Sequence, residues 1–221
     1  MELAVEPKSV LRQAVENMRI AIFEGMFKPG ERLVETDLCA RLRISRPSLR
    51  EALRTLEAER LIVIAPNRGP SVAMLTWDVA RQIYTVRALL EGEAAALCAE
   101  RGDREQLERM ATALKAFSAA VKANHASGRI KSTDDFYQAL QTGSGNQIIE
   151  EVLQGLQSRI NYLRTRSMAK GQRAKESLKE MTAIYQAIVA KDPIAAREAS
   201  KLHIANASKT AESAFAAGKI A

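Results

Sequence analysis

Three short helical segments followed by two strand-like segments open this chain of 221 residues. Apolar residues recur at helical spacing in the first three, and the breaks between them hold Gly, Pro or a tight turn. Pro66-Asn67-Arg68-Gly69-Pro70 separates the two strand-like segments as a turn would. The helical segments are 9–24, 35–42 and, after a capping Ser45, a stretch to Glu59; the strands are 61–64 and 71–75. This order predicts a winged helix-turn-helix.

From Thr76 onward the sequence reads as helix to its end. Gly, Ser and Asp-Pro breaks divide it into six segments joined by short loops, which is typical of an antiparallel bundle. The expected helices are 78–101, 103–126, 130–142, 146–169, 174–190 and 193–216. We therefore expect a mainly α protein with two domains: residues 1–75 as the winged helix-turn-helix and residues 76–221 as a helical bundle.

Charge is informative mainly through local clusters. The net charge is +7, yet the first 75 residues carry twelve Lys and Arg against ten Asp and Glu. One cluster lies around the third helix and comprises Arg41, Arg43, Arg46, Arg50 and Arg54. A second contains no acid and comprises Arg159, Arg164, Arg166, Lys170, Arg173 and Lys175. We expect a solvated face at the second cluster, rather than added non-specific contact with DNA.

The composition argues against several other classes of protein. The first eight residues include charges, so they lack the apolar core of a signal peptide, and no uncharged apolar run approaches a membrane span. Cys39 and Cys98 are too few and too far apart for a disulfide framework or a zinc cluster, and both are expected to be buried thiols. A cytoplasmic protein with no membrane partner is expected.

The third helix carries the residues suited to reading DNA. Its apolar stripe is Leu49, Leu53 and Leu56, which leaves Arg46, Arg50 and the serines on other faces. A helix N-terminus favours phosphate, and arginines in the first turns can reach guanine edges. Taken alone, this is the composition of a solvated arginine face. The surrounding helix–turn–helix–hairpin order favours DNA reading.

Four segments of the first domain resemble the DNA-binding domain of GntR-type bacterial regulators: 25–33, 43–53, 56–61 and 67–69. The resemblance implies a double-stranded DNA operator as partner, contacted by Ser45, Arg46, Ser48 and Arg50, with Arg68 and Gly69 at the wing tip. Two departures are Pro70 after the wing glycine and Arg60, where the family usually has glycine.

The second domain resembles, more loosely, the helical effector domain of the FadR-like subgroup, called FCD. The residues that carry this resemblance include Tyr84–Arg87, Leu90-Glu91, Phe136, Leu140, 143–146 and 196–203. Many members of the subgroup bind a divalent metal through one Asp and three His. The matching positions here read Thr133, Tyr137, Met181 and His203, so three of the four ligands are replaced. A hydroxyl and a thioether are poor ligands for zinc or nickel, so no metal and no cofactor is expected.

The same positions predict a pocket for a small-molecule effector. Thr133 and Tyr137 are four residues apart, as are Met181 and Tyr185, so each pair shares a helix face. With His203 they would line a mostly apolar pocket, where Arg87 could pair an acidic effector. The alternative is a filled core in which Arg87 pairs with Glu91.

The combined interpretation is a homodimeric DNA-binding transcriptional regulator that senses a small organic acid, repression being the commoner mode in the family. An enzyme with a DNA-binding appendage is disfavoured, because no phosphate loop, nucleophile–base pair or metal cluster is evident. A DNA-binding protein whose helical domain is structural and senses nothing remains the alternative.

Overall fold

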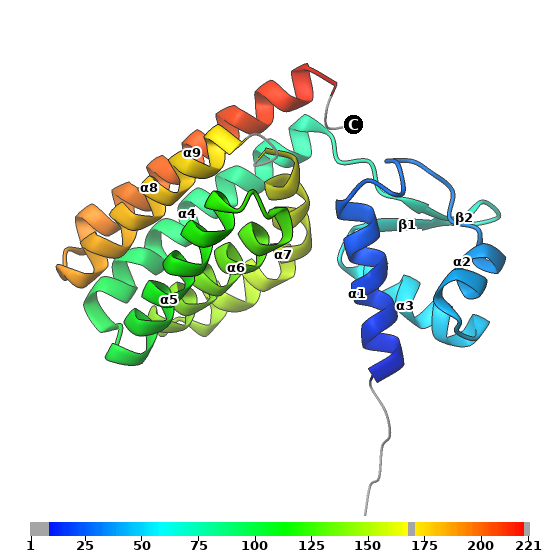
Figure 1. The fold of residues 1–221 in the computed structure, drawn as a ribbon, viewed down its shortest axis with the longest axis horizontal. Coiled ribbons are helices and arrows are strands. Elements are labelled where there is room, and N and C mark those ends of the chain that lie inside the picture. The colour runs from blue at the N-terminus through cyan, green and yellow to red at the C-terminus, as the bar shows by residue number, and fades with distance from the viewer. Residues whose placement is uncertain (1–8, 168–170, 219–221) are drawn as a thin grey trace, which may run out of the picture. The chain divides into compact units, whose positions relative to one another are not determined.

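The computed structural model describes residues 9–167 and 171–218. It separates into two compact units, residues 1–75 and 76–221, and Figure 1 shows each. The first holds three helices and a two-stranded sheet, and the second holds only helices in its described part. The expected fold class, a winged helix-turn-helix followed by a helical bundle, is confirmed.

The first unit is built on a small apolar core between its helices and the sheet. Helix α1 (Ser9–Phe23) packs against α3 (Arg46–Ala58), and α2 (Glu35–Leu42) also contacts α3. The side chains that fill this core are almost fully buried: Met18, Ile22, Leu49, Leu53, Leu56 and Ile62. The buried leucines of α3 therefore fix which of its faces remains exposed.

The turn between α2 and α3 is tight. Arg43 adopts a left-handed conformation with φ 54°, and its neighbour Ile44 donates its backbone N–H to Cys39 O at 3.2 Å. Ser45 then caps α3 by accepting a hydrogen bond from the backbone N–H of Ser48 at 3.3 Å. Pro47 in the first turn has no N–H to leave unsatisfied.

The wing is an antiparallel hairpin of β1 (Ile62–Ala65) and β2 (Gly69–Val72). The expected strands, 61–64 and 71–75, were displaced by one residue for β1 and by two to three for β2. The reason is that Leu61 N–H still bonds Leu56 O at the end of α3, while Ile62 pairs with Val72 and Ala65 with Gly69. An isolated bridge from Arg32 to Ser71 widens the sheet on its β2 side.

The second unit is a bundle of six helices in the described part of the chain (Figure 1). Helix α4 packs along α9, α5 along α6, and α8 along α9. The bounds are α4 (Trp77–Arg101), α5 (Arg104–Lys122), α6 (Ala126–Gly143), α7 (Gln147–Ser167), α8 (Gly171–Val189) and α9 (Pro193–Ala216). The expected break at Ser127-Gly128 was wrong, because α6 begins at Ala126 and includes both residues.

The bundle core is apolar through its middle and contains Phe117, Phe136, Leu140, Met181 and Ile184, each with no exposed surface. Cys98 is buried in the same core, and burial raises the pKa of its thiol to about 11. Cys39 is only half-buried, contrary to the expectation that both thiols are buried. In the described part of the chain, no helix is long and apolar enough to cross a membrane.

Candidate DNA-binding surface and ligand cavity

The first turns of α3 present a polar surface. Arg46 and Arg50 are exposed, and the hydroxyls of Ser45 and Ser48 lie 2.9 Å apart at the helix N-terminus. Arg50 forms an open ion pair with Glu35 of α2 at 3.3 Å, and its side chain keeps 63% of its surface exposed. Such an exposed pair is weak, so Arg50 can exchange Glu35 for a phosphate or a base edge.

The wing tip carries the other two residues expected to contact DNA. Arg68 is exposed in the turn, and its backbone N–H bonds Ala65 O at 3.1 Å. Gly69 has φ 76°, a conformation that side chains disfavour, although space around it would admit a Cβ. All six residues expected to contact DNA therefore lie within this unit on α3, at its cap, or at the wing tip.

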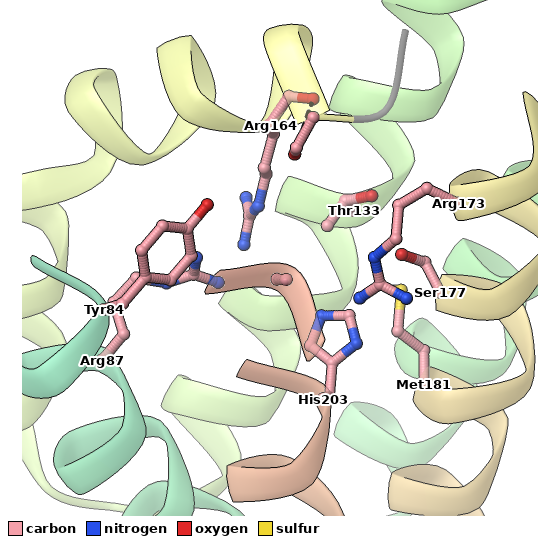
Figure 2. Close-up of a pocket in the computed structure, with 10 residues that line it drawn as sticks. Tyr84, Arg87, Thr133, Arg164, Arg173, Ser177, Met181 and His203 are labelled. Atoms are coloured by element: carbon pink, nitrogen blue, oxygen red, sulfur yellow. Dashed lines mark hydrogen bonds between the residues drawn. The ribbon is translucent and has the colours of Figure 1, made fainter. Parts of the chain in front are cut away.

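The second unit contains a small cavity among α4, α6, α7, α8 and α9. Figure 2 draws the side chains that line it and labels residues from all five helices. Its described lining residues are Tyr84, Arg87, Thr133, Arg164, Ser167, Arg173, Ser177, Met181, His203 and Ala207. Measured by where the centre of a water molecule fits, its volume is about 20 Å³, room for roughly one water molecule.

Three arginines and one histidine line the cavity, and none of the described lining residues is an acid. The acids lie behind the arginines. Arg87 donates through Nε to Glu91 Oε1 at 2.7 Å, in a pair whose two side chains are each 1% exposed. Arg164 donates through Nη1 to Asp134 Oδ1 at 2.6 Å.

Arg173 belongs to a larger network on Glu180. Its Nη1 and Nη2 groups donate to the two carboxylate oxygens at 3.0 and 2.8 Å. His203 Nδ1 lies 2.6 Å from Glu180 Oε2, and Asn206 Nδ2 donates to Oε1 at 2.8 Å. Burial alone would raise the pKa of Glu180, but the bonds from His203 and Arg173 outweigh it and lower the pKa to about 2.

His203 is neutral near pH 7. Burial lowers its pKa, and the hydrogen bond with Glu180 opposes this only in part. Because the ionised Glu180 can only accept, His203 must carry its proton on Nδ1. Its Nε2 lone pair remains available as an acceptor.

Comparison with known proteins identifies the family. Residues 11–72 match the bacterial regulatory proteins of the gntR family, and residues 82–206 match the FCD domain. The chain is a GntR-family transcriptional regulator with an FCD domain. The expected resemblance to this family is confirmed.

Relatives of this GntR regulator cover nearly its whole length. It is 28% identical to the HTH-type transcriptional regulator YdhC of Bacillus subtilis strain 168, over 90% of this chain and 88% of that protein. It is also 28% identical to the Glc operon transcriptional activator of Escherichia coli strain K12, over 92% and 89%.

Solved structures have the same fold. A GntR transcriptional regulator from Rhodococcus sp. RHA1 matches with a TM-score of 0.77 and 26% identity, covering 94% of this chain and 99% of that one. E. coli McbR/YncC matches with a TM-score of 0.80 at 21% identity, covering 95% and 100%, and this likeness concerns the fold alone.

Four of the six residues expected in the effector pocket of this regulator line the cavity: Arg87, Thr133, Met181 and His203. Tyr137 is buried behind it, with its ring 6.1 Å from that of His203 and 5.0 Å from the guanidinium carbon of Arg164. Tyr137 Oη has no hydrogen-bond partner among the described residues.

Tyr185 was wrongly placed in the pocket. It is half-buried and packs against the apolar core instead. The cavity follows the stripe Arg173, Ser177 and Met181 toward the start of α8, whereas Tyr185 lies one turn further, about 6 Å along the axis. The pair Met181 and Tyr185 shares a face, but the two residues stand at different levels of the bundle.

The second basic cluster was expected to be a solvated face, and this expectation was wrong. Arg164 and Arg173 are 6% and 4% exposed and line the cavity, while Arg159 is half-buried and, among the described side chains of the cluster, Lys175 alone is exposed. Lys170 and the side chain of Arg166 lie outside the described residues. The acid-free run of arginines was the sequence signal that could have identified these two residues.

The residues present do not fit the divalent metal that many FCD domains bind. Thr133 Oγ1 donates to Arg129 O at 2.7 Å, and Met181 offers only a thioether. His203 is the single imidazole of the four positions, and the guanidinium of Arg173 lies among the same lining residues. Within residues 9–167 and 171–218, no group of three or more His, Cys, Asp or Glu side chains could hold a metal ion.

Proposed function

We propose that this GntR regulator binds an operator in double-stranded DNA as a homodimer and that its FCD unit responds to a small organic acid. It would act in the cytoplasm, by binding rather than by catalysis. The observation that supports an acidic effector is the lining of the cavity, where three guanidinium groups and no described carboxylate face the same space.

Repression is the proposed mode, since an unliganded regulator on an operator can block transcription by occupancy alone. One relative is named as an activator, the Glc operon transcriptional activator. A reporter gene behind the selected operator distinguishes the two modes, because deletion of a repressor raises expression and deletion of an activator lowers it.

The DNA-reading role is tested by selecting genomic fragments with the purified full-length protein and measuring affinity for the selected operator. Arg46→Ala and Arg50→Ala should each lose operator discrimination, because a good arginine–guanine pair contributes about 1–3 kcal/mol. Arg104→Ala, an exposed arginine on α5, is the matched control and should bind as the native protein does. Unchanged operator affinity in both α3 variants would overturn the assignment.

The sensing role is tested by a thermal-shift screen of organic acids. A true effector should raise the melting temperature and also change operator affinity. The small volume of the cavity favours a second candidate, a helical unit that is structural and senses nothing. That candidate predicts that no acid in the screen changes either property.

A further inference from the structure

We propose that the cavity binds a short, polar carboxylic acid through arginine alone, with the guanidinium of Arg173 as the fixed cation where many FCD domains hold a metal ion. This inference rests on the proposed sensing function and concerns how the ligand is held. Its central observation is that Arg173 lines the same cavity as Thr133, Met181 and His203, the positions that match the metal ligands of the subgroup.

Arg173 is held in place by a network of hydrogen bonds. Both of its Nη groups bond Glu180, and that carboxylate is also held by His203 and Asn206. The Arg173 side chain is 4% exposed, so its charge acts in a poorly solvated space where it interacts strongly.

Two further guanidinium groups face this space from other helices. Figure 2 shows Arg87 from α4, Arg164 from α7 and Arg173 from α8 pointing toward one another around the cavity. Both hydrogen bonds that Arg164 makes to described residues run through Nη1, and its Nε and Nη2 groups donate to none of these residues. Burial, and then the nearby charge of Arg87, lower the pKa of Arg164, and a carboxylate between the two would relieve that repulsion.

The rest of the lining defines the class of acid. Four of the lining residues carry a hydroxyl group, Tyr84, Thr133, Ser167 and Ser177, whereas Met181 and Ala207 are apolar. The water-sized volume means that lining side chains other than Arg173 must move to admit even a compact ligand. A short di- or hydroxy-carboxylic acid fits this lining, and a long acyl chain does not.

The first test needs no variant. Full-length protein is treated with a chelator, and the binding of malonate, succinate, citrate and octanoate is measured by calorimetry with and without added Zn²⁺ or Ni²⁺. At least one short acid should bind with an affinity that the metals leave unchanged, and octanoate should not bind. Binding that requires a metal would overturn the inference and leave acid sensing standing. No binding under either condition would overturn both, and the DNA-binding role would be unaffected.

The second test removes the fixed cation without leaving its acid unpaired. The double variant Arg173→Gln with Glu180→Gln should lower the affinity for the short acid by about tenfold or more, because a hydrogen bond to a charged group is lost. Arg197→Gln with Glu93→Gln removes a half-exposed pair that joins α9 to α4 away from the cavity. This control should bind as the native protein does. Equal affinities in the two double variants would reject the role of Arg173, and circular dichroism establishes that both are folded.

Discussion

At Gly143, the last residue of α6, there is no room for a side chain. A Cβ built there would lie 2.6 Å from Cys98 Sγ, which is itself buried in the core. Gly143→Ala should therefore cost about 1–3 kcal/mol of unfolding free energy, measured by urea denaturation. Gly155→Ala on α7 meets nothing within 4 Å and should instead stabilise by up to about 1 kcal/mol. Similar effects of the two substitutions would contradict this reading of the core.

His203 makes the stability of the bundle dependent on pH. Its folded-state pKa lies below the ordinary value of 6.5, so the unfolded chain takes up the proton first as pH falls. Stability contributed by neutral His203 is therefore present above pH 6.5 and decreases as pH falls below it, by at most about 1.4 kcal/mol per pH unit. Glu180 raises the pKa of His203, whereas the charges of Arg173 and Arg87 lower it.

The measurement is urea denaturation of native protein and His203→Asn between about pH 7.5 and about pH 5.5. Asn can still donate to Glu180 but does not titrate, so the variant should lose less stability over this range. Parallel pH profiles of the two proteins would show that His203 does not carry the dependence.

Single residues were predictable where a motif has a fixed local geometry. Ser45 caps α3 and Arg46 is exposed beside it because the spacing of the leucines determines which face is buried. Arg164 and Arg173 were missed because burial of a charge depends on a partner elsewhere. Asp134 lies thirty residues from Arg164, and nothing in the local sequence shows that they meet.

At the scale of elements, the connection between α3 and β1 contains the clearest conflict between sequence and backbone. Arg60 has φ 60°, in the region where glycine is favoured, and the family usually has glycine here. A side chain in this conformation lowers the free energy of unfolding by about 1–2 kcal/mol. This exceeds the free energy lost because glycine makes the unfolded chain more flexible. Arg60→Gly should therefore raise the urea midpoint of the first unit. Arg43→Gly, at φ 54° between α2 and α3, is a second test of the same strain. Lower midpoints in both variants would show that the side chains stabilise these turns.

Most helices could be predicted from apolar spacing, and some of their boundaries from capping residues, whereas other boundaries could not. Asp103 and Asp192 cap α5 and α9 as the sequence indicates. The prediction of a break at Gly128 was wrong because this glycine lies in the first turn of α6. In the first turn of a helix the backbone N–H groups have no partner within the helix. A glycine there says little about where a helix ends.

At the scale of the whole molecule, the two compact units have separate cores. We expect two transitions in scanning calorimetry of the full chain, because each unit has an apolar core of its own. A short acid bound in the cavity should raise only the transition of the bundle. Hydrogen exchange on α3 and α8 assigns the transitions, and a single transition shifted as a whole would contradict independent units.

Helix α4 begins at Trp77, two residues after the first unit ends at Leu75, and Arg87 lies ten residues along it. Ten residues of helix span about 15 Å, and the whole of α4 spans about 37 Å. If α4 pivots by about 5° near its C-terminal end, its first residue moves by about 3 Å. The helix then works as a lever. The displacement of its first residue depends on where along α4 the ligand makes contact. Arg87 lies nearer the moving end of α4 than the pivot. A ligand contact at Arg87 must therefore itself move further than a contact close to the pivot would, to give the same displacement of Trp77.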